Sequence, residues 1–468
     1  MKKYWDKIVN FVALIAFFVA GLVIVNGTTV LGEDKSAYLP VHEFYPILAV
    51  ALCAFIFILV FNIIRKTYKP NYLLVGVFGA LFLIDLLVVI SFKNRVFTFP
   101  LLNEVEEGVF VFGPDTNWFE SNITASLKAM FILEYLILLM TTFSIIDIIP
   151  KIFDGMKLVA LACLIILGIA SFCVIFSYIT EASLYPEFIK HLKDGDQVIY
   201  QVKSIYHDKS SYGVILFLAL IASLFLHIYK KQWWWFIPAG FFYLNLIFVW
   251  DKSSLAFGMV IIISYLITRF FVSFKEHKKR NIIAASIIGG LFLAGIIGFV
   301  VAGIINPRIF EVVTSSVSTK GYSTLATRSW VWSKMQLILS EGSPLFGLGY
   351  ALWRYLLFYY NTYDPVNAIP NNHNDAHNGY YELLGTGGII LLIVFLLLCG
   401  YLVYVGIKHF KENKTLVVFS FTVLTVMFAY MLIASGTPLF SRTLDYSILG
   451  MIIFVPLLSI HYKEKAEN

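Results

Sequence analysis

Charged residues are scarce in this sequence. Only 14% of its 468 residues are Asp, Glu, Lys or Arg, while 59% are hydrophobic. Ordinary globular domains carry about 25% charged residues, and a soluble core could not bury this much apolar surface. A bilayer can, because each helix that crosses it needs about 20 apolar residues. The scarcity of charge excludes a soluble domain and predicts an all-α integral membrane protein.

Cysteines are few, and a leader cleavage site and internal repeats are missing. The four cysteines all fall within apolar runs, so we expect buried thiols and no disulfide framework. After Lys2, Lys3 and Lys7, the first apolar run is not followed by a small-residue cleavage site. This pattern favours a first transmembrane helix over a signal peptide.

Apolar runs long enough to cross a bilayer recur along the chain. They predict twelve transmembrane helices, with a large, partly helical extracytoplasmic loop between the ninth and the tenth. The chain then divides into residues 1–304 with spans one to nine, the loop at 305–380, and residues 381–468 with spans ten to twelve and a short cytoplasmic tail. The predicted spans are residues 8–26, 45–64, 72–92, 125–147, 157–179, 212–229, 234–250, 254–272, 282–304, 381–407, 416–435 and 446–461.

The loops between these spans alternate in charge. One set is short and basic, and the other is longer and mixed in sign. Because Lys and Arg accumulate in cytoplasmic loops, we expect a multi-pass membrane protein with both termini in the cytoplasm. Nucleic acid is not an expected partner, since the excess charge of +6 lies in these loops. The basic loops contain Arg65, Lys66, Lys69, Lys151, Lys157, Lys230, Lys231, Lys275, Lys278, Lys279, Arg280, Lys408, Lys411, Lys414, Lys463 and Lys465.

The predicted loop at 305–380 is too long to lack structure of its own. Residues 325–340 show an amphipathic helical pattern that places Trp332, Met335 and Leu339 on one face at the membrane surface. The segment SPLFGLGY follows, and its proline and glycines interrupt the helix. Aromatic residues come next, and NNHNDAHNGYYELLGTGG then leads into the tenth span.

The outward position of this loop restricts its chemistry. No ATP or nucleotide sugar is available there, so a synthetic enzyme needs a donor that is already activated, and lipid-linked pyrophosphate sugars are such donors. Arg328 offers a bidentate fork for phosphate oxygens, and Lys252 offers a second positive charge. His377 can act as a general base near neutral pH, and the aromatic side chains can stack on sugar rings.

At these residues the sequence resembles the O-antigen ligase and Wzy-type polysaccharide polymerase superfamily. That family carries an Arg followed by an aromatic-rich helix, a Pro-Leu-x-Gly-x-Gly turn, and a His-Asn pair ahead of a Gly that opens the next helix. The matching residues here are Arg328, Pro344–Gly349, His377–Asn378 and Gly388. The family's Ser-Arg pair has its best match in Asp251–Lys252–Ser253–Ser254, where a lysine stands in place of the arginine.

The resemblance, readable over roughly residues 250–400, implies a glycosyltransferase that needs no metal and no cofactor. Its donor would be a glycan on undecaprenyl pyrophosphate, and the acceptor hydroxyl would attack the anomeric carbon as the lipid pyrophosphate leaves. By this analogy, His377 activates the acceptor, while Arg328 and Lys252 neutralise the leaving group. Candidate substrate-binding residues are Asn378, Tyr350, Trp332, Arg354 and Arg442.

The resemblance favours a polymerase that joins lipid-linked repeat units into capsule, O-antigen or exopolysaccharide on the outer face of the membrane. Its partners would be the lipid-linked donor, a glycan acceptor and membrane lipids, together with flippase and chain-length regulator proteins. A ligase of the same superfamily, which transfers finished glycan to a lipid, wall polymer or protein, is the nearest alternative.

Simpler interpretations of the same residues stay open. Arg328 could anchor its helix at the membrane interface, and Lys252 could snorkel to the lipid headgroups. Asn378 could cap a helix that begins at the next residue. His373 and His377 are spaced like zinc ligands, but their segment lacks the Glu of the metalloprotease signature. The aromatic residues could form an interfacial belt.

Two acidic residues inside predicted spans, Asp85 and Glu134, motivate an alternative of another class. Ionisable residues at such depth default to functional candidates, and a polysaccharide-related transporter or flippase would use them. The predicted spans are mostly unbroken, however, whereas transporters often carry interrupted helices at the midplane. A non-catalytic scaffold would not need an Arg, Lys and His set on one side.

Overall fold

The computed structural model describes about half of the chain. The described residues are 155–180, 189–194, 197–202, 209–249, 251–273, 324–341, 343–348 and 376–433, with single positions within 53–87, 278–304 and 353–357. The helices are α6 (Gly155–Thr180), α7 (Lys209–Lys230), α8 (Phe236–Val249), α9 (Lys252–Ser273), α12 (Thr324–Glu341), α14 (Gly379–Lys408) and α15 (Lys414–Met431), with a 3-10 turn η5 (Trp233–Trp235) and strands β1 (Ile189–Asp194) and β2 (Gln197–Val202).

Four of the described helices are long and apolar enough to cross a membrane. Their apolar spans are Tyr212–Lys230, Lys252–Val272, Gly379–Lys408 and Lys414–Met431, and α6 and α8 contain shorter apolar stretches. These six helices coincide with six of the twelve predicted spans. The chain is therefore a membrane protein with several transmembrane helices, while the other six predicted spans lie outside the well-described residues.

The prediction of an all-α protein misses a β hairpin. Strands β1 and β2 pair antiparallel, with Ile189 opposite Val202 and Asp194 opposite Gln197. In the sequence, Gly195 and Asp196 separate the strands, and a Gly-containing pair between β-prone runs is a hairpin signal. The predicted architecture contains no strand between the predicted spans at 157–179 and 212–229, and the structure corrects this omission. Apart from this hairpin, the described part of the chain is helical.

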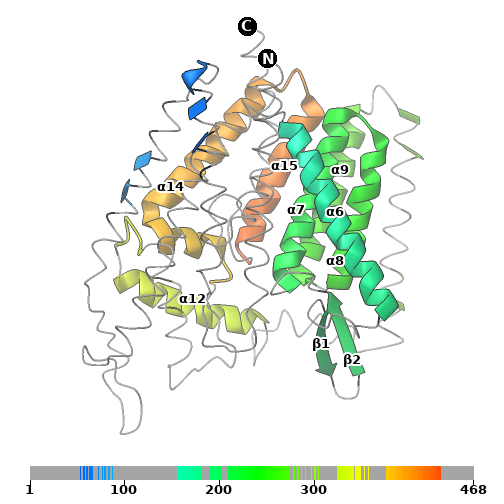
Figure 1. Cartoon of the computed structure of the whole chain (residues 1–468), viewed down its shortest axis with the longest axis horizontal. Coiled ribbons are helices and arrows are strands. Elements are labelled where there is room, and N and C mark those ends of the chain that lie inside the picture. Colours follow the sequence, from blue (N-terminus) through cyan, green and yellow to red (C-terminus); the bar gives the residue numbers. More distant parts are fainter. Residues whose placement is uncertain are drawn as a thin grey trace.

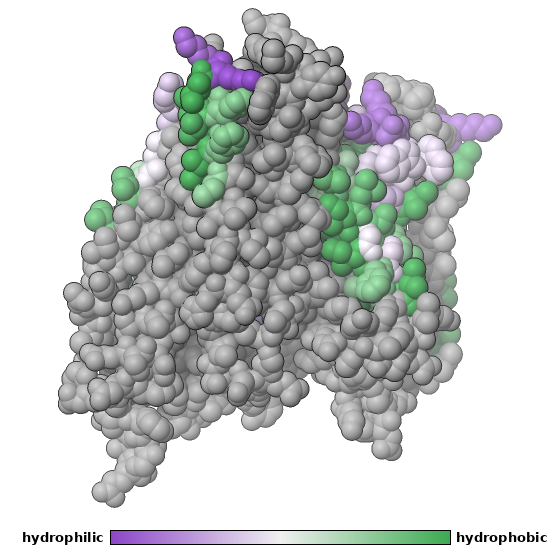
Figure 2. Space-filling view, viewed as in Figure 1, coloured by the Kyte–Doolittle hydropathy of each residue, from purple (hydrophilic) through white to green (hydrophobic). Residues whose placement is uncertain are grey.

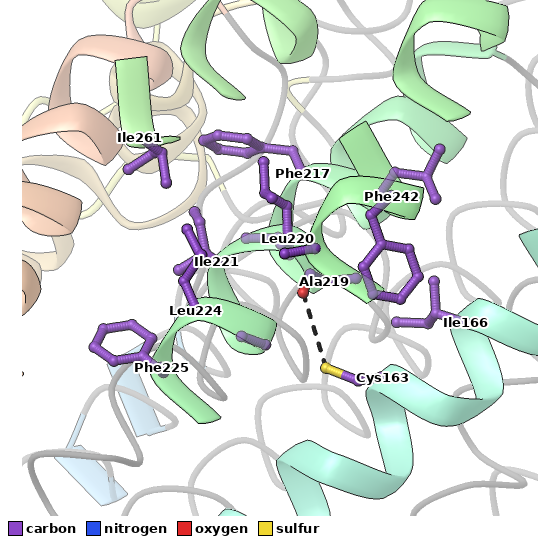
Figure 3. Packing of buried hydrophobic residues seen from close by; sticks show 14 of the residues in the cluster. Cys163, Ile166, Phe217, Ala219, Leu220, Ile221, Leu224, Phe225, Phe242 and Ile261 are labelled. Atoms are coloured by element: carbon purple, nitrogen blue, oxygen red, sulfur yellow. Dashed lines mark hydrogen bonds between the residues drawn. The ribbon is translucent and has the colours of Figure 1, made fainter. Parts of the chain in front are cut away.

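Helix α7 is the centre of the bundle. Nearly every residue from Tyr212 to Ile228 is buried, because α6, α8, α9 and α15 all pack against α7. Figure 3 shows how side chains from four helices meet there, with Cys163 of α6 donating its thiol hydrogen to the carbonyl of Ala219 at an Sγ···O distance of 3.8 Å. A helix that is apolar on all sides is expected in such a position.

The outer helices instead keep apolar residues on their exposed sides. On α9, Val260, Ile267 and Phe271 are exposed, as a surface that faces lipid requires. On the two described parts of the face in Figure 2, hydrophilic residues lie at the upper edge and apolar residues lie below them. Cys53 departs from the expected burial because it is exposed, while the other three cysteines are buried, and all four are free.

The bundle has one basic end. His227 near the end of α7 contacts Arg269 near the end of α9, and Gly406 near the end of α14 packs against Phe421 near the start of α15. The ring of Phe225 near the end of α7 lies 5.0 Å from that of Phe419 near the start of α15. The predicted basic loops at 230–231 and 408–414 therefore lie at the same end of the molecule, which is called the basic end below.

At the opposite end, three helix termini and α12 come together. Ser254 in the first turn of α9 contacts Tyr430 in the last turn of α15, and Asn378 just before α14 donates to the carbonyl of Leu432 just after α15. Helix α12 runs across this end, below the start of α14 in Figure 1. This end, called the site end below, contains the described candidate residues.

Helix α12 matches the predicted helix at 325–340 to within one residue at each end, but its buried face differs from the predicted one. Val331, Met335 and Ile338 are fully buried, while Trp332 and Leu339 are half-buried. The shift arises because α12 packs against α14 rather than meeting only a lipid surface. The buried face is therefore set by a protein neighbour that local periodicity does not reveal.

Candidate functional site

A break in α14 determines where the preceding segment docks. Gly387 and Gly388 have non-helical backbone angles, and Gly388 has a φ of 63° and a ψ of −157°, a region almost restricted to glycine. In an unbroken helix, the amide of Ile389 would donate to the carbonyl of Gly385. Here Ile389 N donates to Pro344 O at 2.9 Å, and Gly385 O accepts from Leu348 N at 2.8 Å.

The turn at 343–348 therefore forms hydrogen bonds with the backbone groups of α14 that have lost their helical partners at the break. Ile390 N also donates to Leu345 O at 3.2 Å, and Gly347 adopts a left-handed φ of 69°. A Cβ atom on Gly347 would lie 2.7 Å from the amide nitrogen of Gly388, so the two backbones touch. Because α12 ends at Glu341, this docking fixes the C-terminal end of α12 on α14.

The middle of α12 is attached to the segment before α14 and to the first turn of α14. The indole Nε1 of Trp332 donates to the carbonyl of Ala376 at 2.9 Å, and Ala376 is fully buried. The rings of Trp332 and Tyr381 lie 6.5 Å apart, and Gln336 donates to the hydroxyl of Tyr381 at 3.0 Å. Two attachments thus hold α12 in a defined position relative to His377, the residue that follows Ala376.

Asn378 caps α14 and ties it to α15. Its side-chain oxygen accepts from the amides of Tyr380 at 2.9 Å and Tyr381 at 3.2 Å, as the asparagine preference at helix N-caps predicts. Its amide nitrogen donates to Leu432 O at 3.2 Å. The capping interpretation of Asn378 is confirmed. Because its side-chain oxygen caps α14 and its side-chain nitrogen binds the end of α15, Asn378 links these two helices at the site end.

His377 has an unusual backbone conformation. Its φ is 48°, in the left-handed region that a non-glycine residue rarely adopts, and its side chain is half-buried. Strain of this kind persists where the surrounding structure enforces it. The Trp332–Ala376 bond on one side and the Asn378 cap on the other provide that constraint, so the imidazole projects from a segment fixed at both neighbours.

Arg328 lies on α12 one turn before the buried Val331, on the side of the helix that faces the bundle. Burial lowers the pKa of the Arg328 guanidinium, while the nearby Asp251 carboxylate and Tyr430 hydroxyl raise it. Arginine remains charged under all these influences. A half-buried cation therefore sits within electrostatic reach of α9 and α15.

Asp251 immediately precedes α9 and caps it. Its carboxylate accepts from the amide of Ser254 at 3.3 Å and from the hydroxyl of Ser254, and Leu255 N donates to Asp251 O at 2.9 Å. The Ser254 hydroxyl lies 2.9 Å from the Tyr430 hydroxyl. Because the Ser254 proton goes to the carboxylate, which only accepts, Tyr430 must donate to Ser254. The hydrogen-bond chain therefore runs from Tyr430 through Ser254 to Asp251.

The described candidates from the sequence thus gather at one end of the molecule. Lys252 opens α9 and is exposed, next to Asp251, whose carboxylate influences Arg328. Trp332, one turn after Arg328, is bonded to the residue before His377. Three further candidates, Tyr350, Arg354 and Arg442, lie outside the described residues, as do Asp85, Glu134 and His373.

The roles of Asp251, Ser254 and Tyr430 are not apparent from the sequence pattern as interpreted above. An Asp three residues before a Ser at the start of an apolar run is a helix N-cap signal, and it could have drawn attention to Asp251. Nothing local marks Tyr430, because its contacts come from distant segments. Its ring stacks on Phe217 at 5.1 Å and meets the edge of Phe257 at 5.3 Å.

The site end combines cationic side chains with a histidine. It offers one half-buried arginine, one exposed lysine and one imidazole, with tryptophan and tyrosine rings nearby. Within the described ranges, no three His, Cys, Asp or Glu side chains gather closely enough to hold a metal ion. No protein-family model matches the chain, and no curated protein sequence is significantly similar to it.

Proposed function

We propose that this protein is a membrane glycosyltransferase that joins undecaprenyl-pyrophosphate-linked oligosaccharide repeat units into a surface polysaccharide. The observation that carries the proposal is the half-buried Arg328 on α12, whose helix is bonded through Trp332 to the residue before His377. A guanidinium can receive the departing pyrophosphate, and an imidazole can accept the proton of the attacking hydroxyl.

The reaction assigns one role to each candidate. His377 takes the proton from the acceptor hydroxyl, whose oxygen forms the new bond to the anomeric carbon of the donor. The bond between that carbon and the pyrophosphate oxygen breaks, and Arg328 and Lys252 balance the charge of the leaving lipid pyrophosphate. Trp332, with Tyr350 and Arg354 on the same predicted loop and Arg442 near the last span, would contact the sugars, and Asn378 holds the histidine segment in place.

The proposal includes a membrane orientation. The basic end would face the cytoplasm, because Lys and Arg accumulate on that side, and the site end would open on the outer face of a bacterial plasma membrane. Twelve spans with cytoplasmic termini follow from the hydropathy and charge pattern of the complete sequence. Lipid-linked donors would reach the site sideways from the bilayer.

A ligase of the superfamily that the sequence resembles would differ from a polymerase in its acceptor, and the same residues would carry out its reaction. The break in α14 is the observation that favours a transporter, because interrupted helices often bind ions or substrates there. At this break, however, the backbone groups of Gly385, Ile389 and Ile390 are bonded to the turn at 343–348. They are occupied by the protein itself, which weakens the transporter alternative.

Gene deletion followed by analysis of the surface glycan and of the lipid-linked pool tests the proposal. Loss of long polymer with single repeat units left on lipid supports a polymerase. Long polymer that remains on its lipid carrier indicates a ligase. Repeat units that accumulate on the cytoplasmic face indicate a transporter and refute the assignment of the site.

Complementation with variants assigns the chemistry. Wild type should restore long polymer. So should a His409→Asn variant, because His409 caps the other end of α14, at the basic end. His377→Ala and Arg328→Gln should not. A proton-coupled transporter would show the reverse sensitivity: Asp85→Asn would abolish its action, whereas it should leave a transferase largely active. Full polymer length and yield from His377→Ala would exclude the mechanism.

A further inference from the structure

We propose that the basic end binds the headgroup of an anionic phospholipid, at a surface formed by the turn between α7 and α8 and by the end of α9. This surface, called the headgroup surface below, consists of Lys230, Lys231, Trp233, Trp234 and Arg269. It lies at the opposite end of the bundle from the candidate site, so a lipid bound there does not depend on the proposed function.

The two helices that carry the headgroup surface both reach the edge of the membrane there. The apolar spans Tyr212–Lys230 and Lys252–Val272 end at or within a few residues of it, and α7 and α9 pack against each other. After α7 come Lys231 and Gln232 and then the three tryptophans of η5. Trp233 and Trp234 are exposed, and tryptophan collects at the headgroup level of a bilayer. The surface therefore lies at headgroup depth.

One buried imidazole joins the turn to α9. Arg269 contacts Nε2 of His227 and donates to the hydroxyl of Tyr265 at 2.9 Å. Because an arginine can only donate, Nε2 is the acceptor, and Nδ1 carries the hydrogen that it donates to the carbonyl of Gln232 at 2.8 Å. The ring of His227 thus lies between the guanidinium and the backbone of Gln232, which places Arg269 close to the residue that follows Lys231.

The backbone at Lys231 is in a conformation that glycine adopts more easily. Its φ is 55°, in the left-handed region where a glycine commonly follows the end of a helix. Residues in such conformations persist where the surrounding structure enforces them, and they gather at ligand-binding sites. Lys230 and Lys231 are both exposed, so the turn presents two adjacent positive charges at a cost in backbone energy.

The elements of the headgroup surface bring no acidic side chain to balance its charge. No Asp or Glu occurs between Asp208 and Asp251, or between Asp251 and Glu276, and Asp251 lies at the site end. At the basic end, Glu412 belongs to the other loop, where its carboxylate lies 3.1 Å from Nδ1 of His409. The surface is therefore complementary in charge to an anionic ligand.

The apolar neighbours of these charges favour a lipid over a soluble anion. Ile237, Leu244 and Phe248 on α8 are exposed, and their spacing of seven and four residues places them on one face of the helix. Because α8 begins directly after η5, this apolar stripe runs from the headgroup surface into the membrane. An acyl chain can lie along it while the phosphate meets the lysines, as basic pockets between membrane helices bind anionic headgroups.

The test follows the tryptophan fluorescence of the purified full-length protein in nonionic detergent as a lipid with brominated acyl chains is added. Bromine quenches the tryptophans that it contacts, so Trp233 and Trp234 report on this surface. Dibrominated phosphatidylglycerol should quench with saturation, whereas dibrominated phosphatidylcholine should need a much higher mole fraction. The variant with both Trp233→Phe and Trp234→Phe should lose the saturable part of the quenching.

Lysine variants test the charges. Each cation near the surface contributes about 5-fold to the affinity for an anionic lipid, so the variant with both Lys230→Gln and Lys231→Gln should need about 30-fold more phosphatidylglycerol for half-saturation. The matched control carries Lys411→Gln and Lys414→Gln, which remove two exposed lysines from the other loop of the basic end. It should bind like the wild type.

Equal half-saturation by the two lipids, or an unchanged value for the Lys230 and Lys231 variant, would overturn the proposal. The same loss in the control variant would also overturn it, because net charge rather than this surface would then attract the lipid. Soluble glycerol phosphate at the concentration of the lipid should leave the quenching unchanged. If it displaced the lipid completely, the surface would be a site for free phosphate and the assignment to a lipid would be refuted.

Discussion

Substitution of Gly388 by alanine should detach α12 from the site end without touching any candidate catalytic residue. Gly388 lies at the break in α14, and its φ of 63° with ψ of −157° is a combination that side chains strongly disfavour. A Cβ atom there would lie 2.3 Å from the carbonyl oxygen of Leu345, well inside any normal contact. The turn at 343–348 would have to move away.

The structure allows the cost to be estimated. The backbone conformation alone costs on the order of 1–3 kcal/mol for a residue with a side chain. Displacement of the turn would also release the hydrogen bonds from Ile389 N to Pro344 O, from Ile390 N to Leu345 O and from Leu348 N to Gly385 O, at about 1 kcal/mol each. The total loss of unfolding free energy is therefore roughly 4–6 kcal/mol, and polymer yield should fall with it because Arg328 loses its fixed position.

The assay is thermal unfolding of the purified protein in detergent, together with polymer yield in cells. Gly400→Ala is the matched control, because Gly400 lies in the same helix and nothing stands within 4 Å of the position of its Cβ atom. That variant should be neutral or more stable by about 0.5–1 kcal/mol. If Gly388→Ala were as stable and as active as Gly400→Ala, the docking of the turn into the break would not hold α12 in place.

Three further perturbations probe the candidate site. His377→Gly should abolish polymer like His377→Ala yet unfold at a higher temperature than His377→Ala, because glycine accepts the φ of 48° at no steric cost; equal midpoints would show that the conformation is not strained. Lys252→Gln should lower polymer yield but stabilise the protein by about 0.3–1 kcal/mol, because a cation in the first turn opposes the helix dipole; loss of stability would point to a structural role. Burial lowers the pKa of Lys334 from its ordinary value of 10.5, so its protonated form costs folding free energy, and that cost disappears as pH rises through the lowered pKa. The unfolding free energy should therefore increase as pH approaches 10.5 from below, and Lys334→Met should remove this increase; the same slope in both proteins would contradict the assignment.

Local patterns in the sequence predict much of the fold. The bounds of α12 follow from its periodicity. The positions of the four described helices that are long and apolar enough to cross a membrane follow from hydropathy, because a helix of 18 or more apolar residues has few alternatives in a bilayer. The same approach misses the hairpin of β1 and β2, whose signal is weak beside long apolar runs. It also places the buried face of α12 slightly off: Met335 is buried as predicted, but Val331 and Ile338 are fully buried where Trp332 and Leu339 were expected.

The candidate site is only partly readable in the same way. Arg328, Lys252 and His377 were selected from residue type, loop position and a family resemblance, and their catalytic roles stay predictions. From the sequence, Gly388 is matched only to the family's Gly that opens the next helix, and the backbone angles of Gly387 and Gly388 are not predicted. Their backbone angles reveal a break whose released hydrogen bonds are taken up by the turn at 343–348.

The sequence by itself determined that the chain is a membrane protein, where its main apolar helices lie and which loops are basic, because hydropathy and charge act over a single helix. Only the tertiary structure decided that Asp251, Ser254 and Tyr430 form one hydrogen-bond chain and that Arg328 stands beside it. The hydrogen bonds join the start of α9 to the end of α15, which are remote in sequence. Their partners are selected by the packing of whole helices, and no local pattern carries that information.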